Sequence, residues 1–68
     1  MPKLYSSGYI VKILEKFGFV LISQKGSHQK LRKGSLTVIV PAGRKEIPVG
    51  TFYSILKQAS LSKEDFEN

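Results

Sequence analysis

The sequence predicts an α+β fold, a two-layer sandwich in which two helices pack on one face of a three-stranded antiparallel sheet. Two segments, one near each end of the chain, carry apolar residues at helical spacing. Between them lie three short strand-like runs, separated by turns that contain glycine and serine. Two amphipathic helices need one sheet face to bury against, so the order α-β-β-β-α predicts two layers. The other sheet face is then exposed, or is covered by a partner.

The first helix is expected from about residue 7 to residue 17. Ser6 and Ser7 can cap its N-terminus, and Gly18 follows the last apolar position, where helices commonly end in the left-handed conformation. The apolar residues recur at i, i+3, i+4 and i+7, on one helix face: Ile10, Ile13, Leu14 and Phe17.

Three strands joined by tight turns predict an antiparallel meander. They are expected at 19–22 (continuing into 23–24), 28–32 and 36–40, with Pro41 ending the third. Alternation along the second strand places His28, Lys30 and Arg32 on one face and Leu31 on the other. If Leu31 points to the core, the histidine and two cations point together to solvent.

The first strand leaves two alternatives for the exposed sheet face. Either Val20 with Ile22 or Phe19 with Leu21 is expected there, beside the basic residues of the second strand. An exposed apolar pair next to cations is a weak indication of protein binding.

The second helix is expected to begin either with Pro48 in its first turn or with Thr51 as its N-cap. Ser62 and Asp65 have the spacing of a capping box, which predicts a short helical turn around Phe66. The apolar residues of the second helix are again at i, i+3, i+4 and i+7: Phe52, Ile55, Leu56 and Ala59.

Length and composition predict one small domain spanning residues 1–68, which is cytoplasmic and has no membrane segment. No apolar run approaches the roughly 20 residues of a membrane span, and no signal-peptide pattern is present. Eleven Lys and Arg against five Asp and Glu give a net charge of +6, which favours a polyanion such as nucleic acid, or an acidic protein, as partner. A merely solvated basic surface remains an alternative.

The chemistry is concentrated around the one histidine, in the run 24–30. Lys25, Ser27, His28 and Lys30 can each hold or move a proton or an anion. The carboxylates are scattered or lie in the tail, and no phosphate-binding glycine loop occurs, so we expect neither a metal nor a nucleotide cofactor. Metal-free RNA cleavage fits better, because RNA supplies its own nucleophile and an imidazole, with a reference pKa of about 6.5, can transfer the proton.

The order and spacing of two elements resemble the HicA toxins of bacterial HicA–HicB toxin–antitoxin pairs. The first element is Gly26-Ser27-His28 within the run 24–30, and the second is the run 50–58, with Gly50-Thr51 followed by Ile55-Leu56-Lys57-Gln58. The resemblance extends from about residue 8 to residue 66. It implies a fold like that of double-stranded-RNA-binding domains, an mRNA interferase activity, and a HicB-type antitoxin that covers the His28 region.

The resemblance also assigns the catalytic role to His28. Many relatives have a second histidine where this chain has Gln29, an aromatic residue in place of Leu31, and a histidine near Ala42-Gly43-Arg44. A mechanism with two histidines is therefore excluded for this chain. The second proton carrier must be a lysine, a tyrosine (Tyr5, Tyr9 or Tyr53) or water.

The candidate site combines the catalytic His28 with basic and turn residues that contact RNA. Gly26 either lets the RNA backbone approach closely or only forms the turn. Candidate RNA contacts, mainly to phosphates, are Lys25, Gly26, Ser27, Lys30, Arg32, Arg44 and Lys45. Two alternatives are a non-catalytic double-stranded-RNA-binding module of the same fold and a basic protein-interaction domain with no RNA role.

Overall fold

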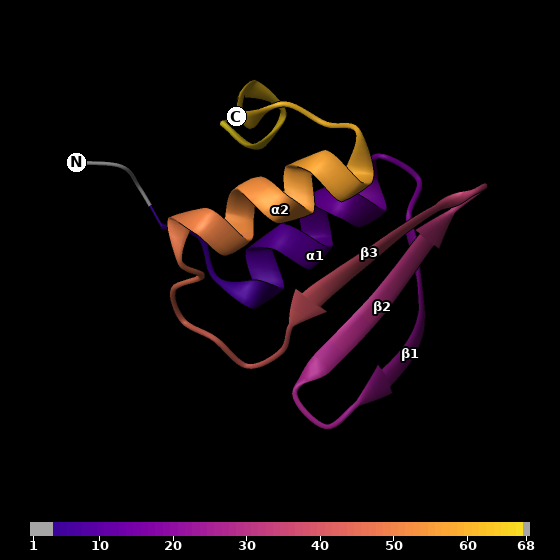
Figure 1. The fold of residues 1–68 in the computed structure, drawn as a ribbon, viewed down its shortest axis with the longest axis horizontal. Helices are drawn as coiled ribbons and strands as arrows, with labels where there is room; N and C mark the ends of the chain where they lie inside the picture. The colour runs from indigo at the N-terminus through magenta and orange to yellow at the C-terminus, as the bar shows by residue number, and fades with distance from the viewer. Residues whose placement is uncertain (1–3, 68) are drawn as a thin grey trace.

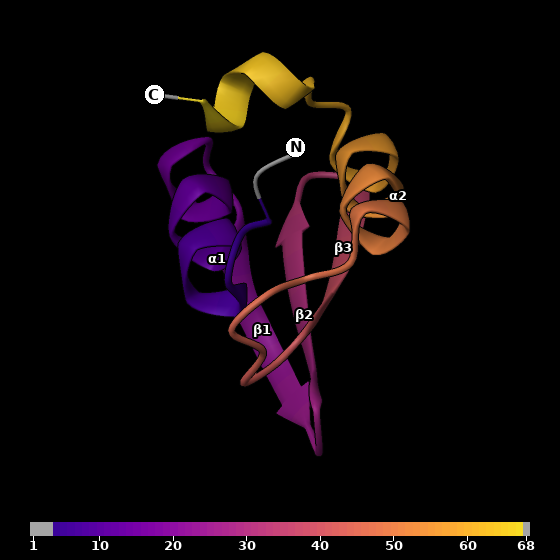
Figure 2. The ribbon, with the colours of Figure 1, turned by 90° about the vertical axis from the view of Figure 1, so that its left-hand side faces the viewer.

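The computed structural model describes residues 4–67, and its elements follow the predicted order α-β-β-β-α, with a short 3-10 helix after them. The helices are α1 (Ser7–Lys16), α2 (Val49–Ala59) and the 3-10 helix η1 (Lys63–Phe66). The strands are β1 (Val20–Lys25), β2 (His28–Lys33) and β3 (Leu36–Pro41). Both helices lie on the same side of the sheet, with α1 beside β1 and α2 beside β3 (Figure 1, Figure 2). The predicted α+β two-layer fold is confirmed.

Helix α1 starts at the predicted residue and ends one residue before the predicted end. The side chain of Ser6 accepts a hydrogen bond from the backbone N–H of Tyr9, which caps the first turn. The last helical residue is Lys16, one before the predicted end, and Gly18 follows with φ of +99°. Three residues of its apolar stripe, Ile10, Ile13 and Leu14, are buried, and Phe17, the C-cap residue, is partly buried against the core.

Helix α2 begins differently from both sequence-based alternatives. Its first residue is Val49, and Pro48 is the N-cap with an extended backbone, φ −57° and ψ 148°. Thr51 is therefore inside the first turn rather than capping it. The C-terminal capping box is confirmed, because Asp65 Oδ2 accepts hydrogen bonds from the backbone N–H and the hydroxyl of Ser62, at 2.9 and 3.1 Å.

The sheet is antiparallel in the order β1-β2-β3, as a meander requires. Strand β1 starts at Val20 and extends to Lys25, one residue later at each end than the predicted run 19–22 with its continuation into 23–24. Phe19 lies just before the strand and is only 3% exposed. The register between β1 and β2 shifts between Leu21 and Ser23, which marks a β-bulge.

The core lies between the helices and the sheet, and it is closed at one end by aromatic rings. The rings of Phe52 and Phe66 meet edge to face with centroids 5.2 Å apart, and the Tyr9 hydroxyl donates a 2.7 Å hydrogen bond to the Phe66 carbonyl. This contact ties η1 back onto α1 across the helix layer. The buried apolar residues are Ile10, Ile13, Leu14, Phe19, Leu31, Val38, Val40, Ile47, Phe52, Ile55, Leu56, Ala59 and Phe66.

No helix within residues 4–67 is long and apolar enough to cross a membrane.

Candidate functional site

The sheet face opposite the helices, hereafter the open face, carries the histidine and the cations of β2. Leu31 is fully buried, while His28, Lys30 and Arg32 are exposed, so the predicted division of β2 into a core face and an open face is confirmed. Cross-strand pairing adds three residues of β1 to the same face. Lys25 pairs with His28, Ser23 with Lys30, and Val20 with Arg32.

The β-bulge allows both ends of β1 to contribute to the open face. In a regular strand Val20 would share a face with residue 22 and not with Ser23 or Lys25. The extra residue at the bulge restores Ser23 and Lys25 to the face of Val20 and His28, while Leu21 pairs with Leu31 on the core face. The sequence left open whether Val20 with Ile22 or Phe19 with Leu21 lies on the open face. Val20 is on this face with 60% exposure, but Ile22 is the extra residue of the bulge.

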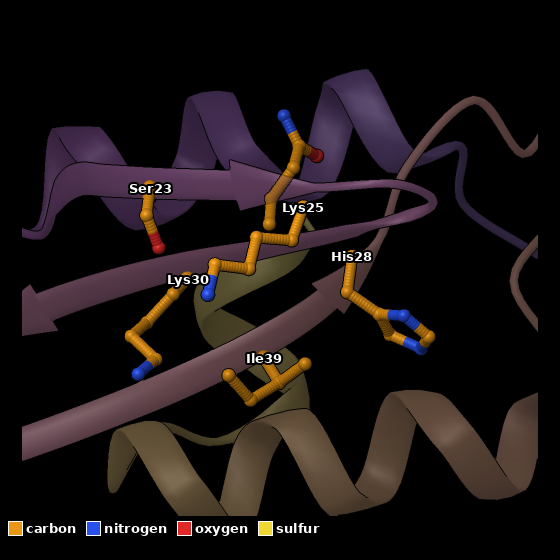
Figure 3. Close-up of a pocket in the computed structure, with 6 residues that line it drawn as sticks. Ser23, Lys25, His28, Lys30 and Ile39 are labelled. Carbon is orange, nitrogen blue, oxygen red and sulfur yellow. The ribbon is translucent and has the colours of Figure 1, made fainter.

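A hollow of about 290 Å³, the cationic hollow, lies over the open face beside His28. Figure 3 shows the labelled side chains rising from the three strands on the same side of the sheet, with His28 and Ile39 toward α2. The Lys25 side chain extends along the face toward Lys30. The lining residues are Ser23, Lys25, His28, Gln29, Lys30 and Ile39.

This arrangement places two ammonium groups within one or two strand positions of the imidazole. Directly paired residues on neighbouring strands have Cβ atoms about 4.5–5.5 Å apart, and residues two apart on one strand, such as His28 and Lys30, lie about 6.5 Å apart. A phosphate beside His28 is therefore within reach of both Lys25 and Lys30, whose long side chains are exposed. The structure brings these three predicted residues together.

Arg32 lies on the open face but does not line the cationic hollow. It lies four residues from His28 along β2, which corresponds to about 13 Å in an extended strand. Its Nε donates a 3.3 Å hydrogen bond to the carbonyl of Gly34, in the turn at the far end of the hairpin. Arg32 is thus a peripheral cation rather than a direct neighbour of His28.

The turn before His28 contains only two residues, Gly26 and Ser27. Gly26 has φ of +55°, and Ser27 does not have positive φ, a combination typical of a type II′ hairpin turn. The carbonyl of Ser27 accepts a 2.6 Å hydrogen bond from the backbone N–H of Ala42, which continues the pairing beyond β3. The open space around Gly26 would accommodate a methyl group, so its backbone conformation is what requires glycine.

Arg44 and Lys45 lie in the loop between β3 and α2, not in the cationic hollow. Ser7, which is only 4% exposed, holds this loop against α1. Its hydroxyl donates to the Pro41 carbonyl at 2.6 Å and accepts from the Arg44 N–H at 2.9 Å, and its own N–H donates to the Arg44 carbonyl at 2.9 Å. The Arg44 backbone is thereby fixed at the N-terminus of α1, on the helix side of the sheet.

A second hollow, of about 310 Å³, shares His28 with the first and lies between β3 and α2. We call it the uncharged hollow, because apart from His28 it has no ionisable lining residue. Ile39 and Pro41 contribute from β3, and Thr51, Ser54, Ile55 and Gln58 from α2.

The uncharged hollow joins the two sequence elements described above, since it combines the histidine of 26–28 with residues of 50–58. Thr51, Ser54 and Gln58 were missed as site residues by the sequence analysis. Their spacing of i, i+3 and i+7 does place them on one helix face. The sequence does not show which sheet residues this helix face contacts, because that depends on how α2 packs on β3.

The three tyrosines proposed as proton carriers are outside both hollows. The Tyr9 hydroxyl donates a hydrogen bond to the Phe66 carbonyl in the helix layer. The ring of Tyr5 stacks on the ring of Tyr9, with centroids 5.0 Å apart. Burial raises the pKa of Tyr5 above its ordinary value, and the nearby Glu67 and Tyr9 add to this increase. Tyr53 is exposed on α2 next to Phe52.

Within residues 4–67 no group of three or more His, Cys, Asp or Glu side chains is placed to hold a metal ion. The groups that line the two hollows are one imidazole, two ammonium groups and several neutral hydrogen-bonding side chains. Such a set can bind a phosphodiester and transfer a proton at it.

Two comparisons with known proteins complete the description. The family model of the HicA toxins of bacterial toxin–antitoxin systems matches residues 9–61, a range that includes every lining residue of both hollows. No curated protein sequence matches the chain.

Proposed function

Because this chain belongs to the HicA toxin family, the toxins of bacterial toxin–antitoxin systems, we propose that it is an mRNA endoribonuclease that works without a metal ion. His28 is its single catalytic histidine. The observation that carries the proposal is the pairing of Lys25 with His28 on the open face, which puts a phosphate-binding cation beside a proton-transfer group. The exposed position of both residues allows a long RNA strand to reach them.

The reaction uses the 2′-hydroxyl of the RNA as nucleophile. This hydroxyl loses its proton, its oxygen attacks the adjacent phosphorus, and the bond from phosphorus to the 5′-oxygen breaks. The leaving 5′-oxygen takes up a proton, so the products carry a 2′,3′-cyclic phosphate and a 5′-hydroxyl. His28 performs one of the two proton transfers. A lysine of the cationic hollow or water exchanges the other proton, because all three tyrosines lie outside the hollows that His28 lines.

Lys25 and Lys30 stabilise the negative charge that builds up on the phosphoryl oxygens. Both line the cationic hollow with His28, and charge-assisted hydrogen bonds to phosphate are stronger than neutral ones. Arg32, Arg44 and Lys45 contribute at longer range, by attracting the RNA and contacting phosphates beyond the cleaved bond. Gly26 and Ser27 form the turn that aligns Lys25 with His28.

The antitoxin partner is proposed to be a HicB-type protein that covers the open face. This face combines exposed apolar side chains, Val20 and Ile39, with the exposed cations Lys25 and Lys30. An acidic partner surface with an apolar centre would neutralise the cations and exclude RNA from His28 at the same time. We expect the two proteins to co-purify, and the complex to leave RNA intact; an active complex would contradict this assignment.

The decisive experiment is cleavage of a long single-stranded mRNA by the purified protein in EDTA, alongside His28→Ala and the control Thr37→Ala. Thr37 is on β3, opposite Arg32, and lines neither hollow. We expect cleavage to persist in EDTA, to be lost in His28→Ala, to continue in Thr37→Ala, and to leave 2′,3′-cyclic phosphate ends. A folded His28→Ala variant that cleaves as well as the wild type would overturn the proposal. Salt-sensitive RNA binding without cleavage by the wild type would favour the non-catalytic binding module instead.

A further inference from the structure

His28 lies at the boundary between two hollows whose chemistry differs. On one side, the cationic hollow contains Lys25 and Lys30. On the other side, the uncharged hollow has an apolar part, formed by Ile39 and Pro41, and a polar part formed by hydroxyl and amide groups of α2. Only His28 and Ile39 line both.

The two hollows match the two chemically different parts of an RNA strand. The backbone carries a negative charge at every phosphate, whereas a base has an apolar face and a polar edge with donors and acceptors. When the phosphate beside His28 contacts the lysines, a neighbouring base can enter the uncharged hollow. There its face would lie on Ile39 and Pro41, and its edge would meet the side chains of α2. The volume of about 310 Å³ is at the lower end of the range of ligand sites, roughly 300–1,000 Å³.

We propose that the uncharged hollow between β3 and α2 is a base-binding subsite, in which Ser54 and Gln58, assisted by Thr51, determine the nucleotide preferred next to the cleaved bond. This inference rests on the proposed ribonuclease function, and it extends that function by naming the residues that give it sequence preference.

Gln58 is the best-positioned member of the subsite, because one end of its side chain is already fixed. Its Oε1 accepts a 2.9 Å hydrogen bond from the backbone N–H of Ile39 on β3. The amide NH₂ group is therefore the part of Gln58 that an incoming base meets, and it can only donate. A fixed donor distinguishes a base edge with an acceptor at that point from an edge with an amino group.

Both surfaces of the subsite are held rigidly by the fold. Pro41 has its carbonyl bonded to the Ser7 hydroxyl, and the next residue, Ala42, is bonded to Ser27. On the helix side, Ser54 and Gln58 are one turn apart on α2, and Ile55 beside them is buried in the core. A rigid site discriminates between ligands better than a mobile one, because little ordering is needed on binding.

The experiment compares cleavage-site preferences on an RNA with a randomised segment, mapped by sequencing the cleaved ends. The variants are Ser54→Ala, which removes a hydroxyl, and Gln58→Glu, which can still accept from Ile39 but presents an acceptor in place of the donor. Matched controls are Ser35→Ala, in the β2–β3 turn, and Gln24→Glu, on the sheet face opposite His28. Preferences are expressed as ratios of bases at each position, so a change in overall rate does not affect them.

We expect the wild type to favour particular bases at one position beside the cleaved bond. Ser54→Ala should weaken this preference about 2- to 10-fold, as expected for one hydrogen bond. Gln58→Glu should change which base is favoured at the same position, and both controls should retain the wild-type pattern. Unchanged base ratios in both variants, or a wild type without preference beside the cut, would overturn the inference and leave the ribonuclease function standing. A folded wild type that does not cleave would overturn both.

Discussion

Lys25 and His28 are directly paired across the β1–β2 hairpin, with only Gly26 and Ser27 between them. Their proximity is therefore produced by a local turn and not by long-range packing. The residues around the pair are placed by tertiary packing. Residues of β3 and α2 lie on one side of His28, and the bulge in β1 determines which other β1 residues share the face of Lys25.

The cations of the open face should contribute unequally to catalysis. Lys25→Ala and Lys30→Ala each remove a side chain that lines the cationic hollow, so we expect kcat/KM for RNA cleavage to fall about 10- to 100-fold. Arg32→Ala serves as the matched control, because its guanidinium is bonded to Gly34 at the far end of the sheet. Rates are to be measured on one RNA at several salt concentrations. An Arg32→Ala loss as large as the Lys25→Ala loss would contradict the assignment.

Gly26 should be required for the turn and not for close approach of the RNA. A chain of 68 residues is accessible to chemical synthesis, so D-alanine can be placed at this position. D-alanine favours the positive φ of Gly26 but adds the same methyl group as L-alanine. We expect Gly26→Ala to lower the free energy of unfolding by about 1 kcal/mol or more, and the D-alanine protein to keep both stability and activity. A stable D-alanine protein that no longer cleaves RNA would show that the backbone of Gly26 must be uncovered.

Ser7 should matter for stability although it lies outside both hollows. Ser7→Ala removes the hydroxyl that bonds the Pro41 carbonyl and the Arg44 N–H, and it leaves both backbone groups without that partner. We expect the free energy of unfolding to fall by about 1–3 kcal/mol, measured by urea denaturation. Ser35→Ala, an exposed serine in a turn, is the control and should change it by less than about 0.5 kcal/mol. Equal stability of the two variants would mean that the loop does not depend on Ser7.

Stability at high pH should depend on Tyr5. Burial, with smaller contributions from Glu67 and Tyr9, raises the pKa of Tyr5 above its ordinary value of 10.0. The folded protein then holds the phenolic proton more tightly than the unfolded chain does. This contribution to stability is fully present below the unfolded pKa and is lost as the pH rises through the folded one.

The dependence on Tyr5 can be isolated by comparing the wild type with Tyr5→Phe in urea denaturation between pH 8 and pH 11. The free energy of unfolding should fall more steeply above pH 10 in the wild type than in Tyr5→Phe. Tyr53→Phe, which removes an exposed phenol, should follow the wild-type curve. Parallel curves for the wild type and Tyr5→Phe would contradict the prediction.

The sequence by itself determined the element order, the core-facing residues of both helices and the open face of β2. These follow from local periodicity, because helix and strand repeats of 3.6 and 2 residues divide buried from exposed positions. The proximity of Lys25 and His28 was also predictable from sequence, because only a two-residue turn separates them. The family assignment, made on a resemblance from about residue 8 to residue 66, is confirmed by the match over residues 9–61.

Only the tertiary structure decided which distant residues join His28. The bulge at Ile22 has no reliable signal in the sequence, yet it sets which β1 residues share the open face. Pro48 in the first turn of α2 and Thr51 as its N-cap were both compatible with the sequence, whereas the structure starts the helix at Val49 with Pro48 as N-cap. The second hollow arises because α2 packs along β3, where Gln58 caps the N–H of Ile39. Contacts between residues far apart in the chain depend on packing geometry, which local periodicity does not encode.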